Sequence, residues 1–234
     1  MKHFSAASFI LLLAGAPFIP PSYAADKRKG PDEIGARDIP TATYDLRPAE
    51  GSRFALEVFK SKLWEGRKHT FVFDRFSGEL SFYHEQPERS TVRFVVESAS
   101  ARCVDDWVKS HQLKDIEKAA IQGTMAAAQF PEITFHSTTI KAKSSGQYEV
   151  GGLLTIRDHT KPVALIVKAT PREDGIWVEG SGQIRLSDFG LKPPRGVAGV
   201  SLFIGTKDEM TVQFALLATS TSPGVSAGAL RDLN

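Results

Sequence analysis

The stretch VGGLLTIRDHTKPVALIV, residues 150–167, places a charged centre between two apolar arms. The arms, 152–156 and 163–167, are rich in Leu, Ile and Val and have the length of β-strands. The centre holds an acid, a base and two cations, a set that a reaction centre, a ligand clamp or a turn could use. We interpret the segment RDHTKP as the turn of a hairpin, because hairpin turns are ordinarily polar and wet. The arms then predict two neighbouring antiparallel strands.

The same alternation of apolar and polar residues recurs along most of the chain. It has the period of a strand with one buried face. The apolar positions are Phe54, Leu56, Val58, Phe71, Phe73, Leu80, Phe82, Val92, Phe94, Val96, Ile133, Phe135, Ile184, Leu186, Met210, Val212, Phe214 and Leu216. In the segment QIRLSDF this alternation predicts a strand that continues through Asp188. Many short strands separated by turn residues indicate an antiparallel sandwich or closed barrel.

The composition is that of one soluble globular domain. Of 234 residues, 41% are hydrophobic and 24% are charged, and the formal net charge of +2 offers no electrostatic case for nucleic-acid binding. Fifteen Phe stand against four Tyr and three Trp, a bias that adds apolar area without buried hydrogen-bonding groups. Cys103 is the only cysteine, which excludes a disulfide within the chain.

The two ends of the chain differ from the middle. Residues 1–24 have a basic start, a short apolar run and small residues at Ser22 and Ala24, which predicts a signal peptide cleaved after Ala24 and a periplasmic or secreted product. Residues 25–41 are predicted to be a flexible linker and residues 219–234 a disordered tail. No later segment is long and apolar enough to span a membrane as a helix.

Residues 105–129 interrupt the period of two. They are rich in Ala, Lys, Gln and Glu and contain no Pro before Pro131, a composition typical of a helix. Gly123 is expected to divide the segment into two helical pieces. We expect this helical insertion to cover one end of the sheet, and a partner-binding role for it stays open.

Motifs of known chemistry are absent from the sequence. No nucleophile elbow, zincin motif, phosphate loop or dinucleotide fingerprint occurs, so we predict no catalytic residue, no metal site and no cofactor. A metal-assisted or acid–base enzyme built from His69, His136 and His159 remains an alternative, because strands can bring distant histidines together.

Three blocks together resemble the YceI family of exported, lipocalin-like proteins. They are FPEITFHST (130–138), the opening stretch and RLSDFGL (185–191), preceded by YDLRPAEGSRFALEVFK (44–60). The resemblance covers about residues 42–218, the predicted domain. It implies an extended antiparallel up-and-down barrel with a helical insertion and a tunnel for a polyisoprenoid or another long-chain amphiphile. Family members usually have Gly where this chain has Asp158, so Asp158 is expected to accept a left-handed backbone.

A barrel of about eight strands has room for one ligand, and burial of its hydrocarbon chain would drive binding. We therefore predict a non-catalytic carrier or sequestering protein for a polyisoprenoid, an isoprenoid quinone or a similar amphiphile. A transient membrane or membrane-protein partner is compatible with this role, and a structural barrel that docks through its helical insertion is the other alternative. The predicted tunnel lining is Phe71, Phe73, Phe82, Phe94, Phe135, Leu154, Ile156, Leu165, Val167, Leu186, Phe203, Val212 and Phe214. Arg157, His159 and Lys161 are candidate contacts for the ligand's head group.

Overall fold

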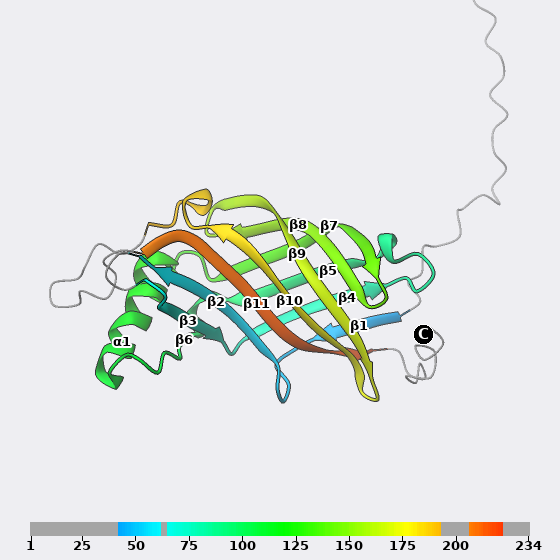
Figure 1. Ribbon diagram of the computed structural model, residues 1–234, viewed down its shortest axis with the longest axis horizontal. Helices are drawn as coiled ribbons and strands as arrows, with labels where there is room; N and C mark the ends of the chain where they lie inside the picture. Colours follow the sequence, from blue (N-terminus) through cyan, green and yellow to red (C-terminus); the bar gives the residue numbers. More distant parts are fainter. Residues whose placement is uncertain (1–41, 62–64, 193–205, 222–234) are drawn as a thin grey trace, which may run out of the picture. The chain divides into compact units, whose positions relative to one another are not determined.

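The computed structural model describes residues 42–61, 65–192 and 206–221. Most of these residues are in strands, and one short helix lies at an end of the sheet (Figure 1). The strands are β1 (Ala42–Leu46), β2 (Arg53–Lys60), β3 (Lys68–Phe73), β4 (Phe76–Phe82), β5 (Thr91–Glu97), β6 (Ala101–Cys103), β7 (Glu132–Ser144), β8 (Gln147–Ile156), β9 (His159–Arg172), β10 (Gly175–Arg185) and β11 (Thr206–Ser220). The helical segments are η2 (Pro87–Arg89), η3 (Ser98–Ser100), α1 (Ser110–Lys118), η4 (Ala119–Thr124) and η5 (Ser187–Phe189).

The strands form a closed antiparallel barrel. Eight of them follow one another in the order β1-β4-β5-β7-β8-β9-β10-β11, and pairing of β11 with β1 closes the ring. The remaining three, β2, β3 and β6, continue the sheet from β11 at one end of the barrel. The predicted lipocalin-like, mainly β fold with a helical insertion is confirmed.

Side chains at paired positions of neighbouring strands form rows on the inner face of the barrel. One such row runs from Phe94 on β5 through Phe135 on β7 to Leu154 on β8. A β-bulge between Ser137 and Thr139 shifts the register of β7. Because side chains alternate between faces, this extra residue lets the strand return to the inner face at Ile140, which is buried. The inner rows form one hydrophobic cluster that extends around the barrel.

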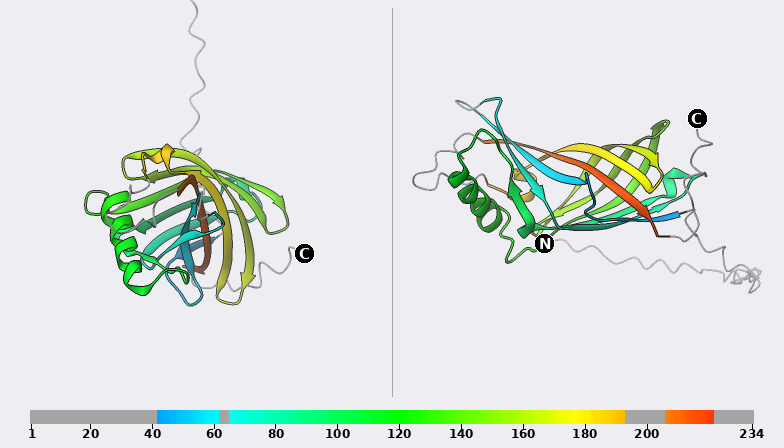
Figure 2. Two further views of the ribbon diagram at one scale, coloured as in Figure 1. Left: turned by 60° about the vertical axis from the view of Figure 1, so that its left-hand side comes forward. Right: turned by 90° about the horizontal axis from the view of Figure 1, so that it is seen from below.

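The helical insertion lies at the end of the barrel that carries β3 and β6 (Figure 2). The helix α1 continues directly into the single wide turn η4, so Gly123 does not divide the segment, and residues 105–109 and 125–129 are not helical. Ile116 is fully buried, and Leu113 packs against the core. The inward stripe of this helix is therefore used for packing on the barrel.

Two strand boundaries differ from those expected. The strand β10 ends at Arg185, and Leu186 to Phe189 turn into η5, so the predicted strand through Asp188 is wrong. Ser187 binds Asp208 of β11 through its amide and its hydroxyl, at 2.8 and 2.6 Å, which stabilises the helical turn. The strand β11 continues to Ser220, which pairs with Tyr44, beyond the expected domain end at residue 218. Among the described residues, no helix has the length and apolarity needed to cross a membrane.

Candidate functional site

The centre of the barrel contains an apolar cavity of about 110 Å³. Its walls come from every strand of the ring and from β2, and Thr134 is the one polar residue among them. They are Leu46, Phe54, Leu56, Leu80, Val92, Phe94, Val96, Ile133, Thr134, Phe135, Val150, Leu154, Ile156, Val163, Leu165, Val167, Val178, Ile184, Val212, Phe214 and Leu216. A cavity of roughly 10–15 Å³ already holds one water molecule. The barrel is thus not filled by its own side chains.

A second apolar cavity of about 60 Å³ lies next to the first, toward the helical insertion. The two cavities share Leu56, Ile133 and Ile156, which we call the neck. The second cavity is bounded on one side by Ala120, Thr124 and Met125 of the insertion. The insertion therefore closes the end of an apolar space made of two adjacent chambers.

Glycines on the inner face explain why large aromatic side chains leave the centre open. A Cβ atom on Gly152 would lie 2.4 Å from the ring of Phe135, and one on Gly180 would lie 2.4 Å from the ring of Phe214. These rings therefore lie over bare backbone of the neighbouring strand, against the wall rather than across the lumen. The pairs place rigid apolar surface around the cavity without filling it.

The structure brings most of the predicted lining residues to these two cavities. Phe94, Phe135, Leu154, Ile156, Leu165, Val167, Val212 and Phe214 line the first, and Phe71, Phe73, Ile156 and Leu186 line the second. Phe82 lines neither cavity; it is partly buried near the end of β4 with its ring 5.9 Å from that of His84. Phe203 lies outside the described residues. That the lining residues bind a ligand stays a prediction.

Sequence reasoning missed other residues of the walls. Leu46, Val150, Val163 and Val178 line the first cavity although they were not singled out. Val150, Val163 and Val178 lie on the same alternating face as a residue that was, so the period of two contained their signal, whereas no residue of β1, which carries Leu46, was singled out. Neck residues such as Leu56 and Ile133 were placed on the inner face, but only the fold shows that they separate two chambers.

The three candidate head-group residues do not form one cluster in a turn. Only Arg157 and Asp158 connect β8 to β9, and His159 and Lys161 belong to β9 itself. The left-handed residue is Arg157, with φ 59°, and not Asp158 as expected. The Arg157 guanidinium lies over the ring of Phe130 at 5.2 Å, and His159 Nδ1 lies 2.7 Å from the Asp158 carboxylate. The pKa of Asp158 lies below its usual range, because its carboxylate forms a hydrogen bond with its own backbone and, second in effect, the hydrogen bond with His159.

Lys161 lies at a surface depression where the barrel wall loosens. Pairing of β9 with β10 ends at Ile166 and Ser181, and the depression of about 300 Å³ lies beyond that point. Val163 and Ile184 line both this depression and the first cavity. Its rim carries charges of both signs, from Lys161, Arg185, Asp188 and Glu209. Charged groups therefore lie close to the apolar cavity in this part of the wall.

The histidines named for an enzymatic alternative differ in their surroundings. His69 is 1% exposed and its Nδ1 lies 2.6 Å from Asp105 Oδ2. His136 lies on the outer face of β7 and is exposed, whereas His159 is partly exposed beside Asp158. The three side chains do not share one cleft, so the geometry does not favour an enzyme built from them.

Cys103 is buried, and its backbone amide donates a hydrogen bond to Glu117 Oε1 of α1 at 3.0 Å. Burial raises the pKa of its thiol to about 12. A thiol with this pKa is a poor nucleophile at neutral pH. The two cavities of the barrel provide apolar volume, and none of the residues discussed above is an activated catalytic group.

Comparison with known proteins identifies the family to which this architecture corresponds. The sequence profile of the YceI-like domain matches residues 44–218. Protein YceI of Escherichia coli O157:H7 is 30% identical over 133 residues, 54% of this chain and 65% of that protein. A UPF0312 protein of Yersinia pestis (strain Pestoides F) is 32% identical over 132 residues, with the same shares of both chains. The match spans slightly less than two thirds of these relatives.

Solved structures show the same fold. BcnA of Burkholderia cenocepacia superposes with a TM-score of 0.58 and 20% identity, covering 73% of this chain and 98% of that chain. The YCEI protein of Campylobacter jejuni superposes with a TM-score of 0.52 and 19% identity, covering 70% and 91%. At these identities the likeness concerns the architecture of the barrel.

Proposed function

Because this chain belongs to the family of YceI-like domains, we propose that it binds a long-chain amphiphile, such as a polyisoprenoid or an isoprenoid quinone, inside its barrel. The proposed role is that of a carrier or sequestering protein without catalytic chemistry. The predicted signal peptide supports a place for this activity in the periplasm or outside the cell.

The observation that carries the proposal is the pair of adjacent apolar cavities that share the neck residues as lining. Burial of hydrocarbon contributes about 0.8 kcal/mol per methylene, so about ten methylenes supply roughly 8 kcal/mol. Association costs at least about 4 kcal/mol, so measurable affinity needs most of the chain to be buried. A ligand that extends through both chambers meets this condition better than one that occupies a single chamber.

The depression beside Lys161 supports a place for the ligand's polar end. A chain that entered through the loosened wall would keep its head group near Lys161 and Arg185 while its apolar part lies in the first cavity. Arg157 and His159 are less suited to this task, because they already contact Phe130 and Asp158. Of the three candidate head-group residues, we assign the contact to Lys161.

Native mass spectrometry of the full chain expressed in bacteria tests this function. We expect an additional mass that organic extraction removes and that chromatography identifies as a long-chain lipid. Two aspartate variants on one strand separate the inner face from the outer face: Leu165, 8% exposed, lines the cavity, whereas its neighbour Ile166 is 59% exposed. Leu165→Asp should lose the lipid, and Ile166→Asp should keep it.

A third variant tests the head-group assignment. His159→Ala should leave the lipid content unchanged. Loss of the lipid in that variant would assign the head-group contact to His159 in place of Lys161. A wild-type protein that purifies without lipid and binds none from a lipid extract would refute the proposed function. Equal lipid loss in Leu165→Asp and Ile166→Asp would show that the cavity is not the binding site.

A further inference from the structure

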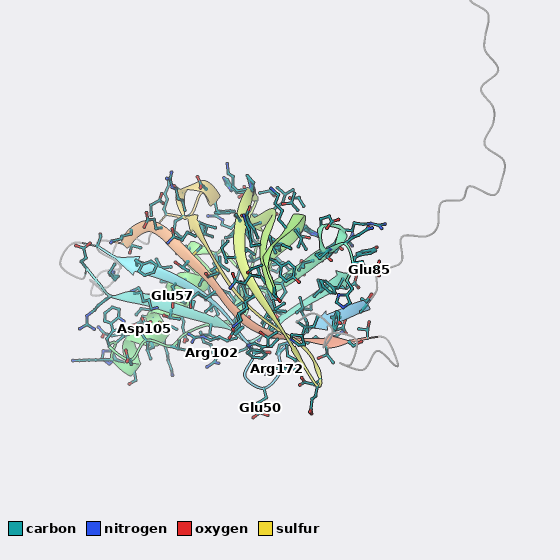
Figure 3. The ribbon with its side chains drawn as sticks, turned by 45° about the vertical axis from the view of Figure 1, so that its right-hand side comes forward. Glu50, Glu57, Glu85, Arg102, Asp105 and Arg172 are labelled. Carbon is teal, nitrogen blue, oxygen red and sulfur yellow. The ribbon has the colours of Figure 1, made fainter. Side chains whose placement is uncertain are left out.

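Three side chains with metal-ligating atoms lie together at the insertion end of the barrel. They are His69 on β3, Cys103 at the end of β6 and Asp105 just after it, and all three are buried. One donor atom from each lies within 4.8 Å of the donors of the other two. Figure 3 shows Asp105 near α1 at this end, far from Glu85 at the other. His69 also lines the second cavity, whereas Cys103 and Asp105 line neither of the two cavities proposed for the lipid.

The register of two strands produces this cluster. Phe71 of β3 pairs with Cys103 of β6, and the Val104 amide donates to the Thr70 carbonyl at 3.0 Å. Antiparallel pairing carried two residues further places His69 opposite Asp105. Cys103 and Asp105 point to the same side because Val104, between them, is exposed.

Neighbouring groups hold the carboxylate and the imidazole in place. The Thr70 amide donates to Asp105 Oδ1 at 2.8 Å, which leaves Oδ2 facing His69. The Trp107 ring stacks on the His69 ring at 5.1 Å, and its Nε1–H donates to the Lys68 carbonyl at 3.0 Å. Such outer contacts are characteristic of metal sites, where they fix the orientation of each ligand.

From this geometry we propose that His69, Cys103 and Asp105 bind one Zn²⁺ ion. Thiolate, imidazole and carboxylate are the three ligand types that zinc accepts, at about 2.3, 2.0–2.1 and 2.0–2.2 Å. The Cys103 thiolate and the Asp105 carboxylate neutralise the two charges of the ion, so the buried site is neutral overall. Tetrahedral zinc completes its shell with a water molecule at the fourth position. The present Nδ1–Oδ2 distance of 2.6 Å is that of a hydrogen bond, so these two side chains move slightly apart when the ion enters.

Metal titration of the full chain, free of any affinity tag and stripped with a chelator, tests the proposal. We expect one Zn²⁺ per chain by elemental analysis after equilibrium dialysis. Co²⁺ in the same site should give a thiolate-to-cobalt charge-transfer band and tetrahedral ligand-field bands. Cys103→Ser should abolish the charge-transfer band and weaken zinc binding at least about 100-fold. Loss of an outer-shell partner already weakens metal binding by up to about 100-fold, and Cys103 is a direct ligand.

A matched control uses a histidine on the surface. His136→Ala removes an exposed imidazole from the outer face of β7 and should leave zinc binding unchanged. Because a substitution at a buried site can unfold the barrel, circular dichroism of each variant accompanies the titration. X-ray absorption of zinc-loaded wild type needs no variant and should show one sulfur ligand at about 2.3 Å.

Several results would overturn the proposal. They are a wild-type chain that binds no stoichiometric zinc, a cobalt spectrum without the thiolate band, and an unchanged affinity in folded Cys103→Ser. In each case the cluster would be a hydrogen-bonded tie between β3 and the segment after β6. None of these results depends on the lipid, so failure of the zinc site and failure of lipid binding are distinguishable.

Discussion

A substitution at the neck between the two chambers gives the sharpest test of how the barrel holds a chain. Ile156 is 2% exposed, lines both cavities and pairs with Ile133 across β8 and β7. Ile156→Phe places a ring where a ligand must pass from the first chamber to the second. The second chamber has about 60 Å³ beside about 110 Å³ in the first, roughly one third of the total.

That fraction sets the expected loss of affinity. If about ten methylenes contribute roughly 8 kcal/mol, excluding one third of them removes about 2–3 kcal/mol, a fall in affinity of roughly 30- to 150-fold. A short-chain ligand that fits the first chamber should lose almost nothing. Competition with a fluorescent apolar probe, over a series of alcohols of increasing length, measures both effects.

The same substitution on the outer face provides the control. Ile166→Phe, on the exposed side of β9, should leave the whole series unchanged. Overpacking costs roughly 1–3 kcal/mol of stability, so a denaturation curve must show that Ile156→Phe is folded. A fall in affinity that is equal for short and long chains, or that also appears in Ile166→Phe, would refute the division into two chambers.

Two further predictions concern single groups. Hydrogen bonds from Ser187 hold the pKa of Asp208 below its usual range. These bonds therefore stabilise the fold at pH values above the pKa of an unfolded aspartate, and the contribution disappears as the pH falls through the lower folded-state pKa. Ser187→Ala should therefore raise the pKa of Asp208, measured by NMR titration, and shift acid unfolding to higher pH; an unchanged pKa would contradict the contact. Burial raises the pKa of the Cys103 thiol from 9.0 to about 12, so metal-free native protein should hold roughly a thousandfold less thiolate than an exposed cysteine. Ellman's reagent at neutral pH should react with it only after unfolding, and rapid reaction of the native protein would show that the thiol is accessible.

Alternation in the sequence was enough to predict an antiparallel sandwich or barrel and most of its inner wall, and the resemblance to the YceI family selected the barrel. Apolar residues such as Phe135 and Leu154 occupy every second position of their strands, and a strand with one apolar face must bury that face. Phe82 belongs to the same face but lies at the end of β4 and lines neither of the two cavities. Alternation specifies which face of a strand points inward, but not how far along the barrel the lumen is open.

Strand boundaries at the turns were less predictable. Arg157 takes the left-handed conformation expected of Asp158, because only two residues connect β8 to β9 and their positions in the turn follow from the pairing of Ile156 with His159. Likewise β10 ends at Arg185 because Asp208, 21 residues later in the chain, binds Ser187. Asp208 lies outside the local sequence of β10, and the position of each turn residue depends on how the whole of β8 pairs with β9.

Residue alternation in the sequence predicted the antiparallel sheet and its apolar inner face, and the blocks that resemble the YceI family indicated the closed barrel and the family. Tertiary structure alone decided that Gly152 and Gly180 let aromatic rings lie flat on the wall, that a neck divides the lumen, and that His69, Cys103 and Asp105 meet. Each of these features depends on the register between strands. Register arises from pairing of the whole sheet, and a shift of one residue would turn every one of these side chains to the opposite face.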